Sequence, residues 1–367
     1  MSGTITINST DLANAIKPQL LQMPEITQHQ YSYIIWTDGT NYYAKNGKTG
    51  QIDYSGTDAA KVIQSVIQNM TSGIIFVKSG TYSISDTIRL KSNIALLGER
   101  MQATTFVSSV SPMFKLDSVY YAEIGNIDLE PAGNWAIQIN GGGLNYIHDV
   151  RIYGGADGIL LDQTYWNVIE RCIFSNQSDS GILIGATNPA NANWILESRF
   201  YSCRKGITLN AGSMITIEKC DISGNGTQYG IECNGLAIIN ECWFENLTRG
   251  VSFYSGAVGS HFGKNYFAGV STPIVNNIPG KVYFENSWNY ITKNSGKATF
   301  SGDGTTTQFK ISHGLASTPS KVLVTPGSSD AKGTFYVTAD ATYIYVNYTT
   351  APPAGTNNID LYWYAEV

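Results

Sequence analysis

One set of apolar positions recurs along the middle of the chain at nearly constant spacing. The six-residue segments that begin at Ile147, Ile169, Ile195, Ile217 and Ile239 each start and end on an apolar residue, and their first residues are 22, 26, 22 and 22 positions apart. Steps of 23 extend the same frame back to residue 124 and forward to residue 262. A period of 20 to 50 residues is typical of stacked-coil architectures. The sequence therefore predicts a stack in which seven coils are visible.

A second apolar column runs in phase with the first, so each coil should contain several short strands. Its members are Ile137, Ile159, Ile182, Ile207, Ile231, Val251 and Ile274, and five of them follow a glycine. One coil cannot bury its apolar face alone, whereas parallel strands stacked about 4.8 Å apart bury a continuous core and satisfy each other's backbone groups. We therefore expect both columns to point into the stack.

Two sets of small or polar residues fall in the same inward frame. The first set contains Cys172, Ser198, Cys220 and Cys242, which we interpret as small stacked core residues. Cys220 and Cys242 would lie in adjacent coils, so either free thiols or a disulfide fits the spacing. The second set predicts a ladder of amides that hydrogen-bond along the axis; it contains Asn145, Asn167 and Asn193.

The segment before the coils predicts a helix that plugs the open end of the stack. Thr57 and Asp58 form a helix start, and apolar residues follow at helical spacing up to Met70. Strand-like runs at residues 73–78 and 88–98 come next, separated by the turn Lys-Ser-Gly-Thr-Tyr at residues 78–82. This order resembles the opening of pectate lyase superfamily β-helices, a group that includes virus tailspikes and polysaccharide depolymerases.

The resemblance implies an all-β fold, a right-handed single-stranded parallel β-helix with an N-terminal capping helix. It covers roughly residues 50–290 and implies little about chemistry, because the superfamily contains lyases, hydrolases, epimerases and inactive proteins.

The chain divides into three predicted parts. Residues 1–50 form an N-terminal capping or attachment segment, and residues 51–295 form the β-helix. From residue 296 the period stops and short alternating segments separated by turn signals take over, which predicts a C-terminal antiparallel β-sandwich over residues 296–367. Similar modules occur at the C-terminus of virus tail proteins.

Composition narrows the class of partner. Charged residues make up 14% of the chain and the net charge is −5, so no basic stripe is available for nucleic acid. No run reaches the roughly 20 apolar residues that span a bilayer, and the first residues lack the basic and apolar regions of a signal peptide. The four histidines show no metal-ligand spacing, so we expect no metal and no cofactor, with calcium only if the protein is a lyase.

Candidate catalytic residues come from the strand of each coil that begins Gly-Ile, where the superfamily's sites usually lie. Asp157 and Asp179 enter this strand in adjacent coils, about 5 Å apart, and Asp162 leaves it. Two carboxylates at 5 to 9.5 Å suit a glycosidase. The alternative is that all three cap turns. Glu170 and Glu218, two coils apart on another strand, form the runner-up pair.

Candidate sugar-binding residues lie beside these acids. Aromatic rings at Tyr165, Trp166 and Trp194 suit stacking on sugars. The remaining candidates could bind an acidic sugar chain and are Lys205, Glu232, Arg249 and Tyr254.

The strand that precedes the first column predicts an apolar external stripe, for example at Tyr146, Val168 and Ile238. Such a stripe is covered either by identical subunits in a homotrimer or by a bound polysaccharide. Two functions remain open. One is an endo-acting polysaccharide depolymerase, a glycosidase or a lyase, at the virion surface or outside a cell. The other is a non-catalytic glycan-binding tailspike or adhesin.

Overall fold

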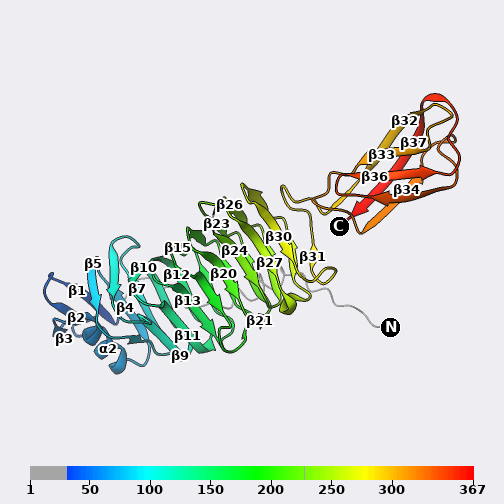
Figure 1. The fold of residues 1–367 in the computed structure, drawn as a ribbon. Helices are drawn as coiled ribbons and strands as arrows, with labels where there is room; N and C mark the ends of the chain where they lie inside the picture. Colours follow the sequence, from blue (N-terminus) through cyan, green and yellow to red (C-terminus); the bar gives the residue numbers. More distant parts are fainter. Residues whose placement is uncertain (1–30, 227) are drawn as a thin grey trace, which may run out of the picture. The chain divides into compact units, whose positions relative to one another are not determined.

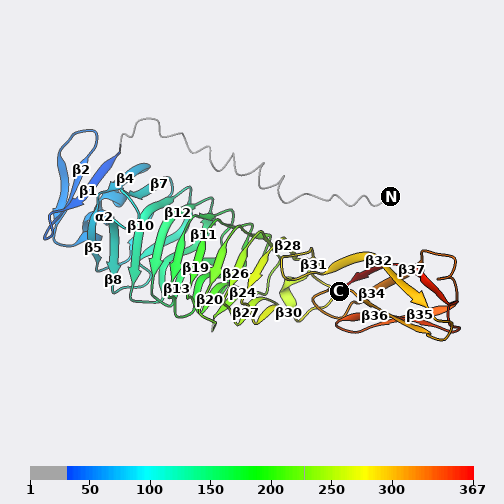
Figure 2. The same ribbon diagram turned by 90° about the horizontal axis from the view of Figure 1, so that it is seen from above.

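The computed structural model describes residues 31–226 and 228–367, and the part that precedes the C-terminal sheets is built mainly from short parallel strands wound into a β-helix (Figures 1 and 2). Both predicted apolar columns are confirmed as stacks of hydrogen-bonded neighbours. Ile147 pairs in register with Ile169 and Ile169 with Ile195, and Ile159 pairs with Ile182 in the second column.

Sheet A forms two arms of each coil, joined at a corner. The first arm contains β4 (Gly73–Val77), β7 (Ile94–Gly98), β14 (Val168–Glu170), β18 (Trp194–Leu196), β22 (Ile215–Glu218) and β25 (Ala237–Asn240). The second arm contains β5 (Gly80–Ile84), β8 (Thr104–Ser108), β15 (Ile173–Ser175), β19 (Arg199–Tyr201), β23 (Asp221–Ser223) and β26 (Trp243–Glu245). Two longer strands, β10 (Glu123–Pro131) and β12 (Tyr146–Tyr153), contribute to both arms.

Sheet B forms the third side of the coil and contains nine strands within the described residues. They are β6 (Ile88–Arg89), β9 (Phe114–Tyr120), β11 (Trp135–Gly143), β13 (Asp157–Asp162), β16 (Ser180–Ile184), β20 (Lys205–Leu209), β24 (Tyr229–Cys233), β27 (Arg249–Phe253) and β30 (Thr272–Asn276). The two strands β6 and β9 precede the seven strands that the periodicity predicts. The periodicity does not include them because their sequences do not repeat the Gly-Ile pattern. A short pair, β17 (Ala190–Asn191) and β21 (Gly212–Ser213), lies beside this sheet.

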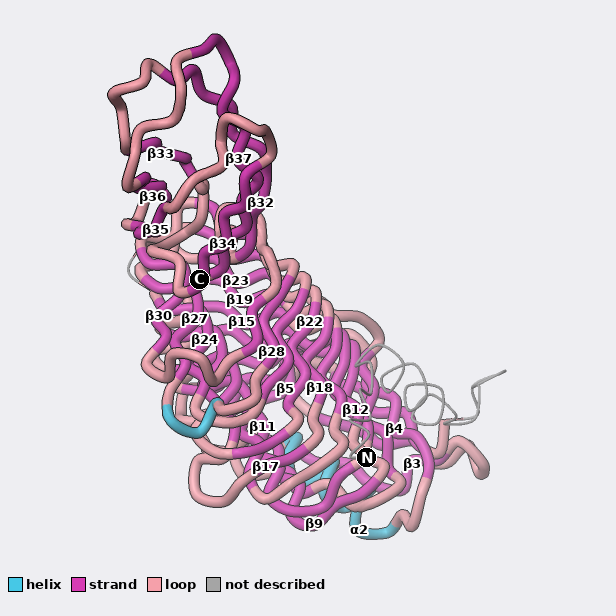
Figure 3. Tube along the Cα trace, turned by 90° about the vertical axis from the view of Figure 1, so that its right-hand side faces the viewer, coloured by secondary structure: helices cyan, strands magenta, loops and turns pink. Residues whose placement is uncertain are grey.

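The coil corners are loops between successive strands (Figure 3). Many of their non-glycine residues adopt left-handed backbone geometry, with φ near +50° to +60°. Arg171, Glu197, Lys219 and Glu241 turn the chain between the arms of sheet A in four successive coils. A left-handed conformation costs an L-residue roughly 1 to 2 kcal/mol. The backbone hydrogen bonds between stacked coils hold these corners, for example from the N–H of Glu197 to the carbonyl of Glu218.

The predicted asparagine ladder is confirmed inside the stack. Asn145 donates through Nδ2 to Oδ1 of Asn167 at 2.9 Å, and Asn167 donates likewise to Asn193 at 2.8 Å. All three side chains are fully buried. The inward cysteines are buried as predicted, and Cys220 and Cys242 form no disulfide with each other, which was one of the two alternatives that the spacing left open.

The N-terminal end of the stack carries the predicted helix, α2 (Ala59–Asn69), with Asp58 as its N-cap. The helix buries one apolar face and packs against the strands at this end, including β5 and β6 (Figure 1). Before it, β1 (Tyr33–Thr37), β2 (Tyr42–Asn46) and β3 (Ile52–Gly56) form an antiparallel sheet that joins the stack through β4. The predicted segment 1–50 is therefore seen in part, since residues 1–30 lie outside the described residues.

The chain separates into two compact units. One runs to Ser260 and includes Gly269–Val282, and the other contains His261–Ala268 and Tyr283–Val367. The second unit begins with β28 (His261–Gly263), β29 (Tyr266–Ala268) and β31 (Tyr283–Phe284). A division at residues 50 and 295 stays a prediction.

The C-terminal part of the second unit consists of two three-stranded antiparallel sheets, as predicted. Sheet D contains β32 (Lys293–Gly302), β37 (Gly355–Glu366) and β34 (Lys321–Pro326), and sheet E contains β33 (Gln308–Ser312), β36 (Tyr343–Tyr348) and β35 (Phe335–Ala339). Their apolar faces form one core that includes Phe309, Ile344, Val346 and Leu361.

Candidate functional site

The outward face of sheet B brings several candidate residues into neighbouring coils. Asp157 begins β13, and the next three coils place Ser180, Lys205 and Tyr229 at the matching position. Three residues further along, Thr208 pairs with Glu232. Thr208 is buried and shares a hydrogen bond of 2.8 Å with the hydroxyl of Ser180, so Glu232 is the accessible polar group of this pair.

A row of ion pairs crosses three coils of this face. Lys205 Nζ lies 2.9 Å from Glu232 Oε2 and 3.7 Å from Asp179 Oδ1. Arg204 Nη1 lies 2.6 Å from the same oxygen of Asp179. The structure therefore brings together three residues that the sequence predicts separately, Asp179, Lys205 and Glu232.

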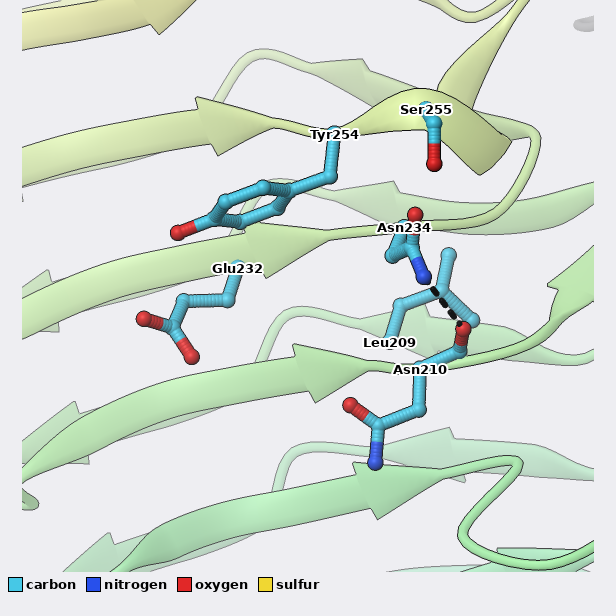
Figure 4. Close-up of a pocket in the computed structure, with 6 residues that line it drawn as sticks. All are labelled: Leu209, Asn210, Glu232, Asn234, Tyr254 and Ser255. Atoms are coloured by element: carbon cyan, nitrogen blue, oxygen red, sulfur yellow. Dashed lines mark hydrogen bonds between the residues drawn. The ribbon is translucent and has the colours of Figure 1, made fainter. Parts of the chain in front are cut away.

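A pocket of about 350 Å³ opens beside this row, at the C-terminal ends of β20, β24 and β27. Glu232 and Tyr254 form one wall, and their side chains extend in the same direction (Figure 4). The rest of the wall comes from Leu209, Asn210, Asn234 and Ser255. Asn234 Nδ2 donates to the carbonyl of Asn210 at 3.1 Å, which fixes the amide in the wall.

Sequence reasoning found Glu232 and Tyr254 but missed the amides of this pocket. Asn210, Asn234 and Tyr254 each directly follow a sheet B strand in consecutive coils, so the same strand-end position is polar three times. That recurrence is the signal that could have located the pocket.

Asp157 is a buried carboxyl at the edge of the same face. Its Oδ1 accepts the backbone N–H of Ser180 at 2.9 Å. Burial raises the pKa of Asp157, and the negative charge of nearby Asp179 acts in the same direction, against the hydrogen bond from Ser180. The two carboxyl groups that the sequence pairs are thus close enough to interact, and their surroundings differ: one is desolvated and the other contacts two cations.

Asp162 does not belong to this group. It ends β13, five residues and therefore about 17 Å from the start of the strand where Asp157 lies. Its Oδ1 accepts the backbone N–H groups of Thr187 and Asn188 at 2.9 and 2.8 Å. The structure gives this carboxylate the turn-capping role, which was the alternative to catalysis.

Tyr165 and Trp166 lie on a corner of the coil, after β13. Tyr165 shares a hydrogen bond of 3.0 Å with the hydroxyl of Tyr120, and its ring meets the ring of Trp166 edge-on at 5.5 Å. The two residues are 37% and 44% exposed, and Trp166 has left-handed backbone geometry. A large exposed ring at a position that favours glycine or asparagine is the pattern expected where a surface residue serves binding.

Trp194 does not join this aromatic corner. It begins β18 in sheet A and is only 8% exposed. Its ring therefore has little free surface for a sugar in this chain, and the stacking role of Trp194 stays a prediction.

Arg249 and Tyr229 extend the charged row by one coil. The two residues pair in register, and the guanidinium carbon of Arg249 lies 5.2 Å from the centre of the Tyr229 ring. Arg249 is exposed, so its charge is available at this face.

The runner-up pair lies on sheet A, away from the row. Glu170 pairs in register with Leu196, and Leu196 with Glu218, which places the two carboxylates two coils or about 10 Å apart. Glu170 is buried and bonds to the hydroxyl of Tyr146 and to Arg171, each at 2.6 Å. Burial, then the bond to Glu170, raises the pKa of Tyr146. These contacts hold the carboxylate of Glu170 below the protein surface.

His148 lies next to that network and also contacts two carboxylates. Nε2 lies 2.8 Å from Glu123 and Nδ1 lies 2.8 Å from Asp149, and the ring stacks on Tyr146 at 4.3 Å. Burial alone would lower the pKa of His148, but the hydrogen bonds and charges of Glu123 and Asp149 together raise it.

Within residues 31–226 and 228–367, no group of three or more His, Cys, Asp or Glu side chains is arranged to hold a metal ion. None of the helices in this part of the chain has the length and apolar character needed to cross a membrane.

Comparison with known proteins places the fold. A family model described as a right-handed beta helix region matches residues 135–295. Among curated proteins, none matches this chain in sequence. Among solved structures, an alginate lyase from Paenibacillus sp. is 14% identical with a TM-score of 0.51, and the match covers 63% of this chain and 97% of the lyase.

Two further solved structures are more distant. The A-module of a mannuronan C-5 epimerase from Azotobacter vinelandii is 12% identical with a TM-score of 0.38, covering 63% of this chain and 95% of the module. A mutant tailspike protein of the E. coli bacteriophage HK620, in complex with a pentasaccharide, is 10% identical with a TM-score of 0.41, covering 84% of this chain and 90% of the tailspike. The chain is therefore a right-handed parallel β-helix protein that distantly resembles an alginate lyase, a C-5 epimerase and phage tailspikes.

Proposed function

We propose that this protein binds a polysaccharide along the outward face of sheet B and cleaves it there by hydrolysis. The observation that carries the proposal is the contrast between Asp157 and Asp179. They are neighbouring carboxyl groups, of which one is buried with a raised pKa and the other contacts Arg204 and Lys205. Pairs of titratable groups with opposed environments are typical of acid and base roles.

In this mechanism Asp157 acts as the general acid. A carboxyl group that stays protonated to higher pH can donate its proton to the oxygen of the bond that breaks. Oδ1 of Asp157 is held by the N–H of Ser180, so Oδ2 is the oxygen that carries this proton. Asp179 acts as base or nucleophile, and Arg204 and Lys205 fix its position.

Sugar units on either side of the cleaved bond would contact the pocket and the aromatic corner. Glu232, Asn210 and Asn234 offer hydrogen-bonding groups for hydroxyls, and Tyr254 offers a ring. Tyr165 and Trp166 offer exposed rings for stacking on the other side. Both groups lie toward the C-terminal ends of the sheet B strands, whereas Asp157 and Asp179 lie at the strand starts, so a bound chain would cross the strands to reach both.

The proposal places the protein outside a cell or on a virion surface, as a homotrimer. The support is the apolar surface of the corner beyond Tyr165 and Trp166, where Tyr121 and Met214, two coils from Trp166 in either direction, are about half exposed. A trimer contact over Tyr165 and Trp166 themselves would exclude sugar from their rings. Light scattering on the purified chain decides this point, since a monomer would remove the argument for a trimer.

Cleavage is tested with a panel of neutral and acidic polysaccharides, by new reducing ends and by absorbance at about 235 nm, which detects the double bond a lyase leaves. Hydrolysis predicts reducing ends without absorbance. Asp157→Asn and Asp179→Asn should each lower the rate by about 10² to 10⁴.

The matched control for these variants is Asp117→Asn. Asp117 lies on the same sheet and also contacts two cations, Lys115 at 2.9 Å and Arg89 at 3.5 Å. It is not part of the proposed pair of catalytic carboxyl groups. Cleavage that survives in both active-site variants, or that fails equally in the control, would contradict the assignment. An increase in absorbance at about 235 nm with every cleavage would show that the reaction is that of a lyase and not a hydrolysis.

A second function, glycan binding without cleavage, is favoured by one specific observation. Asp157 caps the backbone of Ser180 and Asp179 contacts two cations, so both carboxyl groups also have structural partners. This second function would be supported if the protein, immobilised on a column, retained a polysaccharide but released no reducing ends from it.

A further inference from the structure

The outward face of sheet E in the C-terminal unit carries an aromatic and amide surface. Strand alternation and register put eight side chains there in three cross-strand rows. The rows are Gln308–Asn347–Tyr336, Lys310–Tyr345–Thr338 and Ser312–Tyr343. The opposite faces of the same strands supply Phe309, Ile311, Ile344 and Val346 to the core. The eight residues of these three rows are called the sheet E face below.

Three tyrosines dominate the sheet E face. Tyr336 is 63% exposed and Tyr343 is 38% exposed, and the ring of Tyr343 meets that of Tyr345 at 6.3 Å. The hydroxyl of Tyr345 donates to Asp340 at 2.6 Å, which fixes its ring against the sheet. Rigid rings on flat strands are low-entropy contact surfaces for the apolar faces of sugars.

Amide groups lie next to these rings. Gln308 Nε2 donates to Asn347 Oδ1 at 2.8 Å, and Asn347 Nδ2 donates to the carbonyl of Tyr345 at 3.3 Å. These bonds orient both amides, and the carbonyl oxygen of exposed Gln308 has capacity for a hydroxyl donor. Rings with oriented amides between them are suited to a polyhydroxylated ligand.

Lys310 supplies the charge of the sheet E face. Its ammonium lies 5.3 Å from the ring centre of Tyr345 and 6.0 Å from that of Tyr343. Among the ion pairs of the described residues, none involves Lys310. The aromatic contacts therefore position a cation whose charge is left for an anion.

Sheet D of the same unit provides an internal comparison. Its outward lysines are neutralised within the sheet: Lys297 lies 2.9 Å from Asp360, and Lys293 and Lys321 lie 3.4 and 3.7 Å from Glu366. Of these two sheets, it is sheet E whose outward face combines exposed rings with a lysine that no ion pair neutralises, on a chain whose net charge is −5.

We propose that the sheet E face is a second carbohydrate-binding site, specific for an acidic polysaccharide whose carboxylate or sulfate pairs with Lys310. This site is separate from the proposed cleavage on sheet B and does not depend on it. Charge complementarity commits the occupant to an acidic chain, since a neutral glycan would leave Lys310 without a partner.

The test uses the full chain in native gels that contain alginate, polygalacturonate or, as the neutral polymer, dextran. Retardation by at least one acidic polymer is expected, and Lys310→Gln and the double variant Tyr336→Ala/Tyr343→Ala should each weaken it about tenfold. Lys310→Arg and Tyr343→Phe keep charge and ring and should bind like the wild type, which separates lost contacts from lost folding.

Matched controls come from sheet D. Lys297→Gln and Tyr362→Ala remove a paired lysine and an exposed tyrosine of the other face and should leave retardation unchanged. Equal losses in the sheet D and sheet E variants, unchanged binding in the sheet E variants, or equal retardation by dextran would each overturn the proposal. Failure of cleavage on sheet B with intact retardation would contradict the proposed function alone.

Discussion

Lys205 and Glu232 come from neighbouring coils, and the ammonium of Lys205 lies 2.9 Å from Oε2 of Glu232. The same ammonium is 3.7 Å from Asp179, so one cation connects the pocket wall with a proposed catalytic carboxylate. The neutral variant Lys205→Met should lower kcat by about 10² to 10³, the effect of removing one preorganised electrostatic partner.

Steady-state kinetics on the cleaved polysaccharide check this prediction. Lys205→Arg should recover part of the rate because it restores the charge. Lys219→Met is the control, since Lys219 is exposed on a corner of sheet A in the next coil. A Lys205→Met enzyme with normal kcat would show that the cation has no role in positioning Asp179.

The asparagine ladder predicts a large stability loss at its centre. Asn167 donates to Asn193 and to Thr164 Oγ1 at 2.8 Å and accepts from both the backbone and side chain of Asn145. Asn167→Ala would leave buried donors and acceptors without partners, at about 1 to 3 kcal/mol for each. Denaturant unfolding should register a loss of several kcal/mol, whereas exposed Asn188→Ala should change little; similar midpoints for the two variants would contradict the role of the ladder.

His148 predicts that the β-helix is more stable at mildly acidic pH. Its pKa is raised in the folded chain by Glu123 and Asp149, although burial opposes this. A raised folded-state pKa means that the contribution is fully present below the unfolded value of about 6.5 and is lost as pH rises through the folded value. The other ionisable groups that face this cluster are Tyr146, stacked on the ring, Arg171, bonded to Asp149, and Glu170, which pairs in register with His148 and bonds to both.

Thermal unfolding from pH 5 to 9 measures this contribution. The wild type should lose Tm with rising pH more steeply than His148→Gln, which cannot titrate. His261→Gln, a half-exposed histidine 3.3 Å from Glu285, serves as the matched control and should follow the wild type. Parallel profiles for wild type and His148→Gln would refute the prediction.

Trp166 predicts opposite effects on binding and on stability. Asparagine tolerates the left-handed geometry better than tryptophan, so Trp166→Asn should leave stability unchanged or raise it by up to about 1 kcal/mol. The same change removes an exposed ring and should weaken polysaccharide binding about tenfold. Calorimetric titration and unfolding of one preparation test both effects, and a variant that binds normally would exclude the corner from the site.

The sequence could predict the stack because each coil repeats its inward residues. The prediction that Ile147, Asn167 and Cys220 point inward is correct. The repeat fixes the register of the strands, because a shift of one residue would move every such side chain to the other face. Alternation gives the direction of the Trp194 side chain but not what covers it, so the sequence could not predict that it is only 8% exposed. Asp157 and Asp162 look equivalent in the sequence and are both buried, and only the structure shows that Asp157 accepts one backbone N–H whereas Asp162 accepts two.

The five cysteines can report when the coils around them open. All are buried thiols, and burial raises the pKa of Cys172 and Cys203 to about 12 and that of Cys233 to about 11. A thiol-modifying reagent needs a thiolate, so it reacts only where a coil has come apart. The order in which positions 172, 203, 220, 233 and 242 become labelled would therefore reveal from which end the stack unwinds, without adding a single probe to the chain.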